Sequence, residues 1–294
     1  MKKKILVLLI NRTLDLKYFG RTFNHIYFSI LSYAVSKRPN RLFYFFAYLP
    51  SPRGGIYNIR SGNKIYRYIS FKDDALQGDA RTNFQEWEPE SRKLFSKCAA
   101  ESQVIFDVGA YSGVYSLEAS SSNPNASVFA FEPNPKMYQK LLANKSINNF
   151  SKIEAIECAV GEEVGTRKLF LPYGDYTSIA TLIETSNASS KMVLVRKLDE
   201  FRDKNKKVEL IKIDCEGSEF QILNGAIQIL NDDRPIIFLE CLDSQGLLQI
   251  REFLGRFKYS IYKNGPIGIS KGDERNFVWA HQDKIEMLRK FDEN

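Results

Sequence analysis

Residues 104–117 read VIFDVGAYSGVYSL, and this stretch decides the fold. Its first five residues form an apolar run, Gly109 and Gly113 mark a tight turn, and residues 113–120 have the pattern of a helix that begins at the turn. A strand, a glycine turn and a helix in this order are typical of the first unit of an α/β sheet.

Similar apolar runs recur along the chain, at residues 127–131, 153–160, 208–213 and 236–239. Helical patterns accompany them at residues 135–148, 220–230 and 244–257. We expect edge-like strands at residues 167–171 and 192–195, and weaker ones at 260–262 and 277–280. Strands that are apolar throughout and alternate with helices predict a parallel sheet buried on both faces. The sequence therefore predicts an α/β sandwich from about residue 100 to 282.

The composition is that of an ordinary globular protein, with 294 residues of which 44% are hydrophobic and 26% charged. The early apolar run 5–10 is too short for a membrane span or a secretory segment. Four cysteines without a C-x-x-C pair are expected to be reduced thiols in a cytosolic protein: Cys98, Cys158, Cys215 and Cys241. Only His25 and His281 are present, which excludes a histidine-rich zinc site.

The N-terminal part of the chain is strongly basic. Residues 1–68 hold thirteen Lys and Arg residues against one acid, a net charge of +12, whereas the remaining residues carry −5. A helix over 13–35, an aromatic cluster at 43–48 and a hairpin at 56–59 and 64–69 are expected there. One interpretation is a surface for an anionic partner, such as peripheral contact with a membrane. The other is a helical cap that packs on the main domain. Nucleic acid is not favoured, because the aromatics lie on one side of the expected helices.

Polar and acidic residues follow the expected strands, where ligands bind in an open parallel sheet. They are Asp107 with the turn 109–113, then Glu132, Asp214, Glu216 and Glu240. The turn has the spacing D-x-G-x-x-x-G and lacks the third glycine of a pyrophosphate site. The aspartate two residues before its first glycine instead suits a ligand that carries a cation or hydroxyls. Glu132 is placed to accept hydrogen bonds from a ribose diol. Together they favour a nucleoside ligand, although a plain βα turn and a helix-start acid explain each one alone.

Three segments carry a more specific resemblance. Residues 104–117 and 129–135 (FAFEPNP) resemble the first two motifs of an S-adenosylmethionine-dependent methyltransferase. Residues 208–223 (VELIKIDCEGSEFQIL), with Gly225 and Ala226 after them, are similar to the signature of the FkbM family. Residues 86–89, 159–161 and 195–201 fit the same family, so the resemblance extends from about residue 84 to 280. Tyr111 departs from the pattern, because many relatives carry Asn there.

The resemblance implies a Rossmann-like class I methyltransferase sandwich over residues 84–294, with a mostly parallel seven-stranded sheet and helices on both faces. Residues 1–83 are then a basic, aromatic-rich N-terminal extension. The implied cofactor is S-adenosylmethionine. Asp107, Gly109 and Gly113 would shape the methionine end of its pocket, Glu132 would hold the ribose, Cys158, Ala159 and Val160 would lie near the adenine, and Asp214 and Glu216 beside the sulfonium and the acceptor. Ala110, Tyr111 and Pro133 complete the implied cofactor site. A sulfonium is a cation, so the acids favour it electrostatically as well.

The implied reaction is O-methylation of a hydroxyl, on a sugar of a glycan or glycolipid or on a secondary metabolite. No histidine lies between His25 and His281, so we expect any base to be a carboxylate: Glu216 first, Asp214 second, with Glu219 and Glu240 behind them. Clustered carboxylates raise one another's pKa. Glu216 as a helix-start acid and a divalent ion on Asp214, Glu216 and Glu240 are alternatives, and no metal site is assigned. His281 is expected to be structural.

Two other function classes stay open. A nicotinamide-dependent oxidoreductase could use Glu132 on the same kind of sheet, but the third glycine is missing. A non-catalytic binding module could retain the fold, although the clustered acids argue against it. The expected location is the cytoplasm, with contact to the inner membrane face through residues 1–68.

Overall fold

The computed structural model describes residues 55–61, 64–70, 76, 80, 84, 87–172, 180–186, 188–262 and 275–293. The expected helix over 13–35 and the aromatic cluster at 43–48 lie outside the described residues.

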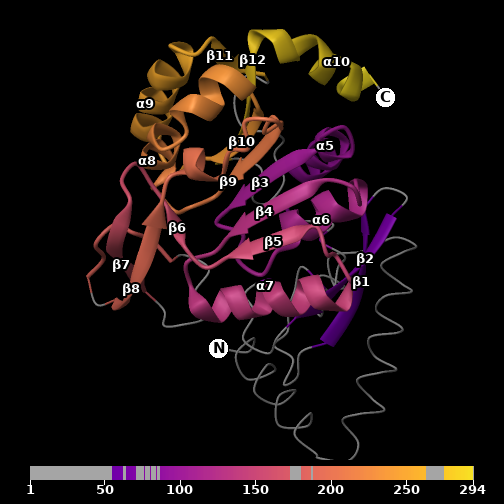
Figure 1. The fold of residues 1–294 in the computed structure, drawn as a ribbon, viewed down its shortest axis with the longest axis vertical. Coiled ribbons are helices and arrows are strands. Elements are labelled where there is room, and N and C mark those ends of the chain that lie inside the picture. Colours follow the sequence, from indigo (N-terminus) through magenta and orange to yellow (C-terminus); the bar gives the residue numbers. More distant parts are fainter. Residues whose placement is uncertain are drawn as a thin grey trace, which may run out of the picture.

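The core of the described chain is a seven-stranded sheet with the strand order β11-β12-β10-β9-β3-β4-β5 (Figure 1). The strands are β3 (Val104–Val108), β4 (Ser127–Phe131), β5 (Ile153–Ile156), β9 (Leu210–Ile213), β10 (Ile236–Glu240), β11 (Tyr259–Ile261) and β12 (Asn276–His281). The pairs from β10 to β5 are parallel, and β12 pairs antiparallel with both β10 and β11. The mostly parallel seven-stranded α/β sheet is thus confirmed, and the strand order reverses between β3 and β9.

Helices cover both faces of this sheet. They are α5 (Pro89–Ala100), α6 (Val114–Ser122), α7 (Pro135–Ile147), α8 (Glu219–Asn224), α9 (Ser244–Gly255) and α10 (Ile285–Glu293). One hydrophobic core packs α5, α6 and α10 against one face, with Phe95, Leu117 and Leu288 buried in it. A second core packs α8 and α9 against the other face, with Leu223 and Phe253 inside it. Because side chains alternate along a strand, each residue of the central strands faces one of these two cores.

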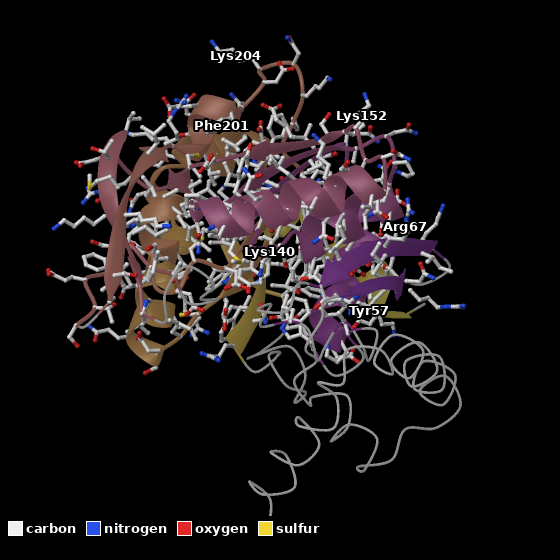
Figure 2. All side chains as sticks on the ribbon, turned by 90° about the horizontal axis from the view of Figure 1, so that it is seen from below. Tyr57, Arg67, Lys140, Lys152, Phe201 and Lys204 are labelled. Atoms are coloured by element: carbon white, nitrogen blue, oxygen red, sulfur yellow. The ribbon has the colours of Figure 1, made fainter. Side chains whose placement is uncertain are left out.

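The region before the sheet contains the expected hairpin. Strands β1 (Gly55–Ser61) and β2 (Lys64–Ser70) pair antiparallel, and this prediction is confirmed. Figure 2 shows the hairpin, with Tyr57 and Arg67, beside α7. Tyr66 and Tyr68 are buried in the core that also contains α5 and α6. The hydroxyl of Tyr68 lies 2.6 Å from that of Ser112, so the hairpin touches the turn that follows β3.

Several expected elements are wrong in detail. The run 153–160 is not one strand, because it leaves the main sheet after β5 and its end, β6 (Ala159–Val160), joins a second sheet. The expected strands 167–171 and 192–195 are confirmed as strands, β7 (Gly165–Leu171) and β8 (Ser189–Arg196), and they belong to that second sheet. The expected elements do not include helices α5 and α10, although apolar residues recur at helical spacing in α10, at Ile285, Leu288 and Phe291.

The expected helix 220–230 is also interrupted. Helix α8 ends before Gly225, and a short π-helical turn follows at Ile229–Asp233. The backbone of Gly225 lies so close to Gly161 that a Cβ atom on Gly225 would come within 2.2 Å of the carbonyl oxygen of Gly161. This close packing fixes the path of the chain between α8 and β10.

Candidate functional site

A pocket of about 580 Å³, including its open mouth, lies at the carboxyl ends of β3, β4 and β9. This is where the strand order reverses, the place at which open α/β sheets bind ligands. Nine predicted site residues line it: Gly109, Tyr111, Glu132, Pro133, Cys158, Ala159, Val160, Asp214 and Glu216. Asp107, Ala110 and Gly113 are not among the lining residues.

The turn after β3 requires its glycines. Gly109 has a φ of +79°, and a Cβ atom there would lie 1.9 Å from the carbonyl oxygen of Asp214. The amides of Gly109 and Ala110 both donate to the carbonyl of Phe131, at 3.0 Å each, which ties the turn to the end of β4. Tyr111 has a φ of +50°, a left-handed conformation that Asn adopts more readily than most residues. The departure at Tyr111 therefore falls at a position where the backbone conformation matters.

Glu132 sits at the end of β4 and faces the pocket. Its two carboxylate oxygens accept hydrogen bonds from the amides of Tyr111 at 2.7 Å and Asn134 at 2.8 Å. Burial raises the pKa of Glu132 to about 7, although both amides lower it. A carboxylate oxygen accepts more than one hydrogen bond, so Glu132 can also receive two ligand hydroxyls.

Asp107 lies beneath the turn. It is buried and accepts a hydrogen bond from the hydroxyl of Ser116 at 2.5 Å. Burial raises the pKa of Asp107 to about 6. Its position supports the first turn of α6 from below, so it acts on the pocket through the backbone of the turn.

The opposite end of the pocket is apolar. Cys158, Ala159 and Val160 form one side, and residues that the sequence analysis missed form the rest: Val108, Phe131, Met137, Leu169, Ala180 and Leu182. Leu169 comes from the second sheet, and no motif marked it. This apolar lining suits a purine base.

Thr181 connects the apolar wall of the pocket to the turn that carries Glu216. Its hydroxyl donates to the carbonyl of Glu216 at 3.0 Å and accepts from the amide of Ile183 at 3.1 Å. A Cβ atom on Gly217, which has a φ of +99°, would lie 2.8 Å from Ile183. The segment with Thr181 therefore packs directly over the turn that follows β9.

That turn presents Glu216. Glu216 adopts a left-handed conformation, with a φ of +50°, and lines the pocket. Burial, and then the charges of Asp214 and Glu219, raise its pKa to about 7. Glu219 is buried and accepts from the amides of Gly217 at 3.0 Å and Cys215 at 3.3 Å, so it holds the turn in place. A residue strained in this way is typical of functional sites.

A buried polar cluster that contains Lys212, Glu88 and Asn276 adjoins Asp214. None of these three residues is among the predicted site residues. The Nζ atom of Lys212 lies 3.4 Å from Asp214 and 3.1 Å from Asn276. Glu88 accepts a hydrogen bond from the hydroxyl of Tyr115 at 2.5 Å. The lysine in the sequence K-I-D was the one available signal for this cluster.

The carboxyls of Asp214 and Glu240 divide the charge between them. Burial, and then the charge of the nearby Asp214, raise the pKa of Glu240 to about 9. Burial alone would raise the pKa of Asp214 too, but the Lys212 ammonium and hydrogen bonds outweigh it and hold this pKa below its usual value. The two pKa shifts thus run in opposite directions, which favours the negative charge on Asp214 and the proton on Glu240.

The remaining predicted residues lie away from the pocket or take other roles. His281 is buried in β12, and its Nδ1 atom accepts from the amide of Asp283 at 3.3 Å, a structural contact. All four cysteines are free thiols. Within the described ranges, no three His, Cys, Asp or Glu side chains are grouped so that they could hold a metal ion. None of the helices that the structure describes is long and apolar enough to cross a membrane.

Comparison with known families decides between the function classes. The sequence profile described as "Methyltransferase FkbM domain" matches residues 107–261, which is more than half of the chain. The chain belongs to the FkbM methyltransferase family. The match begins at Asp107 and ends at β11, so this FkbM domain contains the whole pocket. The methyltransferase prediction is confirmed at the level of the family, and the oxidoreductase alternative is not supported.

Curated relatives are more distant. The chain is 26% identical over 163 residues to "Methyltransferase 1" of Beauveria bassiana (strain ARSEF 2860), covering 48% of this chain and 66% of that protein. It is 30% identical over 154 residues to "31-O-demethyl-FK506 methyltransferase FkbM" of Streptomyces tacrolimicus, covering 42% of this chain and 58% of that protein. The chain thus matches less than two thirds of the length of either relative.

A solved structure has a similar description. The crystal structure of methyltransferase FkbM from Methylobacillus flagellatus KT shares 20% identity with this chain and has a TM-score of 0.48. The alignment covers 70% of this chain and 53% of that one.

Proposed function

We propose that the protein is an S-adenosylmethionine-dependent methyltransferase that methylates a hydroxyl group. The observation that carries this proposal is Glu132, whose carboxylate is held by two backbone amides in the same pocket that Asp214 and Glu216 line. One pocket therefore offers an acceptor for ribose hydroxyls together with acids that can face a cation.

The residues present fit this cofactor. The apolar space between Val160 and Leu182 suits adenine, Glu132 has free acceptor capacity for the ribose hydroxyls, and the acidic end suits the sulfonium. The cofactor, when bound, supplies a methyl group on a positively charged sulfur. The chain's own residues orient the two reactants, which alone contributes a large part of such a rate enhancement.

The carboxylates at the pocket mouth can then serve two separate roles. Asp214, ionised at neutral pH, faces the sulfonium, and Glu216, with a pKa of about 7, is suited to receive the proton of the acceptor hydroxyl. With the cofactor bound, its methyl group would pass from the sulfur, which would keep the electron pair, to the acceptor oxygen. The hydroxyl proton passes to Glu216 and from there to solvent.

The proposed acceptor is a hydroxyl on a sugar of a glycan or glycolipid, or on a secondary metabolite. The name of the Streptomyces tacrolimicus relative, which describes methylation at an oxygen, supports an oxygen acceptor. Release of S-adenosylhomocysteine in the presence of methyl glycosides and of hydroxylated macrolides tests the class. Turnover with none of these acceptors would contradict it.

The rest of the proposal concerns organisation and location. We infer that residues 84–294 form the methyltransferase domain and residues 1–83 an extension, with the cytoplasm as the location. Free thiols support the cytoplasm. Peripheral contact with an anionic membrane through residues 1–68 is supported by their net charge of +12.

Glu132→Ala is expected to weaken S-adenosylhomocysteine binding at least tenfold, about 1.4 kcal/mol. The substitution removes the hydrogen-bond acceptor for the ribose and leaves the amides of Tyr111 and Asn134 without their partner. Isothermal titration calorimetry measures the loss. Glu154→Ala, an exposed carboxylate on the neighbouring strand β5, is the matched control and should bind as the wild type does. Equal affinity in Glu132→Ala would remove Glu132 from the site.

Thr181→Val is expected to weaken the same binding about fivefold. Valine keeps the shape of the side chain but removes the hydroxyl that joins the apolar wall to the carbonyl of Glu216, a loss of about 1 kcal/mol. Thr181→Ser should restore most of the affinity, because it keeps the hydroxyl. If valine and serine gave the same affinity, the hydrogen bond would have no part in shaping the pocket.

A further inference from the structure

A lysine is buried at the centre of the main sheet. Lys212 lies on β9, where all four residues are buried, and its side chain is 1% exposed. Burial of an ammonium group costs several kcal/mol unless opposite charges and hydrogen-bond acceptors surround it. The fold therefore has to surround Lys212 with partners, and the identity of those partners indicates its role.

Strand geometry brings the partners together. Lys212 and Asp214 are two residues apart, so they point to the same side of the sheet, the side covered by α5 and α6. Asp107 on β3 lies opposite Lys212 in the pairing of β3 with β9. Glu240 is the last residue of β10, which lies on the other side of β9. Asn276 on β12 lies opposite Glu240 in the antiparallel pairing of β10 with β12.

Two helices complete the enclosure. Tyr115 of α6 places its ring 5.2 Å from the Lys212 ammonium. The hydroxyl of Tyr115 donates to Glu88, the residue that begins α5. The cation is thus enclosed by elements from both sides of the strand-order reversal.

The acids around Lys212 are not equivalent. Asp107 accepts a hydrogen bond from Ser116 and Glu88 accepts one from Tyr115, and both are buried. Asp214 and Glu240 interact closely, and the charge of Asp214 helps to raise the pKa of Glu240. Within the described chain, Asp214 both forms an ion pair with Lys212 and lines the pocket, with its side chain 28% exposed.

We propose that Lys212 is a positioning residue for methyl transfer: its buried ammonium, in contact with Asp214, keeps the negative charge on Asp214 while Glu240 holds a proton. This inference rests on the proposed function. One ionised carboxylate then stands at the end of the pocket where the sulfonium and the acceptor meet. Its charge also raises the proton affinity of Glu216, the proposed base.

Every charged or titratable group that acts on Asp214 enters the titration of this site. They are Lys212 on the same strand, Glu240 on β10, Arg275 before β12, Asp107 on β3, Glu132 after β4, Glu88 before α5, and Cys215, Glu216 and Glu219 on the turn after β9. Lys212 is the buried cation among them, and its own pKa is raised by Asp214 and Glu88 even though burial opposes this.

The test reads the charge on Asp214 directly and needs no acceptor. The full chain is labelled with ¹³C at the aspartate carboxyl carbon, and the Asp214 resonance is assigned by its loss in Asp214→Asn. We expect this resonance to stay at the ionised position from pH 8 to pH 5 in the wild type. In Lys212→Met it should move toward the protonated position within the same range. Lys212→Arg, which retains the charge, should restore the ionised position.

Two further variants isolate the effect. Lys206→Met removes an exposed lysine and should leave the Asp214 resonance unchanged. Glu240→Gln replaces the protonated acid by an amide that donates a similar hydrogen bond, so Asp214 should stay ionised. If Asp214 is protonated at pH 7 in the wild type, or if Lys212→Met leaves it ionised, the proposal is wrong. The wild-type measurement can overturn the proposal even where Lys212→Met does not fold.

Calorimetry with S-adenosylhomocysteine separates this inference from the proposed function. Binding to the wild type with a protonated Asp214 would overturn only the role of Lys212. An ionised Asp214 without any binding would overturn the proposed function and leave the charge assignment standing.

Discussion

Glu216→Gln is expected to slow methyl transfer about 10²–10⁴-fold, the usual contribution of a positioned base. Glutamine has nearly the shape of glutamate but cannot receive the proton of the acceptor hydroxyl. Affinity for S-adenosylhomocysteine should change little, because Glu216 acts on the acceptor. The rate of S-adenosylhomocysteine release is measured with the best acceptor from the glycoside and macrolide panel.

The pH profile separates a base from a residue that merely shapes the turn. Glu216 has a pKa of about 7 and is active when deprotonated, so the wild-type rate should rise between pH 6 and pH 8. Glu216→Gln should lose this rise. Glu184→Gln, an exposed glutamate next to the Thr181 segment, is the control and should keep both the rate and the profile. Full activity in Glu216→Gln would clear Glu216 of the role.

Arg92→Met is expected to lower the free energy of unfolding by about 3–5 kcal/mol. The Nε and Nη2 atoms of Arg92, on α5, donate to one carboxylate oxygen of Glu118 on α6, at 2.9 and 2.8 Å, and both side chains are buried. A third nitrogen donates to the carbonyl of Phe84 at 3.0 Å. Removing the arginine leaves the Glu118 carboxylate buried without its cation. Urea denaturation measures the loss.

Two comparisons make this prediction specific. Arg167→Met breaks an exposed ion pair with Glu163 and should change stability little. Arg92→Met combined with Glu118→Met should recover part of the stability, because no charge is then left buried. Equal effects of Arg92→Met and Arg167→Met would show that the buried pair contributes nothing special to the packing of α5 on α6.

The elements around the pocket could be predicted from the sequence because their signals are local. The apolar run of β3, the two glycines and the start of α6 are contiguous, so their order alone indicates a strand, a turn and a helix. Glu132 could be placed for the same reason, since it directly follows an apolar strand. Each of these predictions depended on residues close together in the chain.

Features that depend on tertiary contacts could not be predicted. Residues 153–160 have the pattern of an ordinary strand. Nothing local in the sequence indicates that Val160 leaves the main sheet and pairs with β8. The role of Lys212 is equally hidden, because its partners Asp107, Glu240 and Asn276 are far away in the sequence. A lysine within an apolar run gives no sign of the acids that enclose it.

The contact between Tyr68 and Ser112 joins the N-terminal hairpin to the segment that the family profile covers. Ser112 belongs to the loop between β3 and α6, and its carbonyl also accepts from the side chain of Asn144 on α7. The loop between β3 and α6 is thus held in part by Tyr68, which lies well upstream of the residues that the family profile covers. A fragment cut to that profile would keep every pocket-lining side chain and lose the brace that holds the loop in shape.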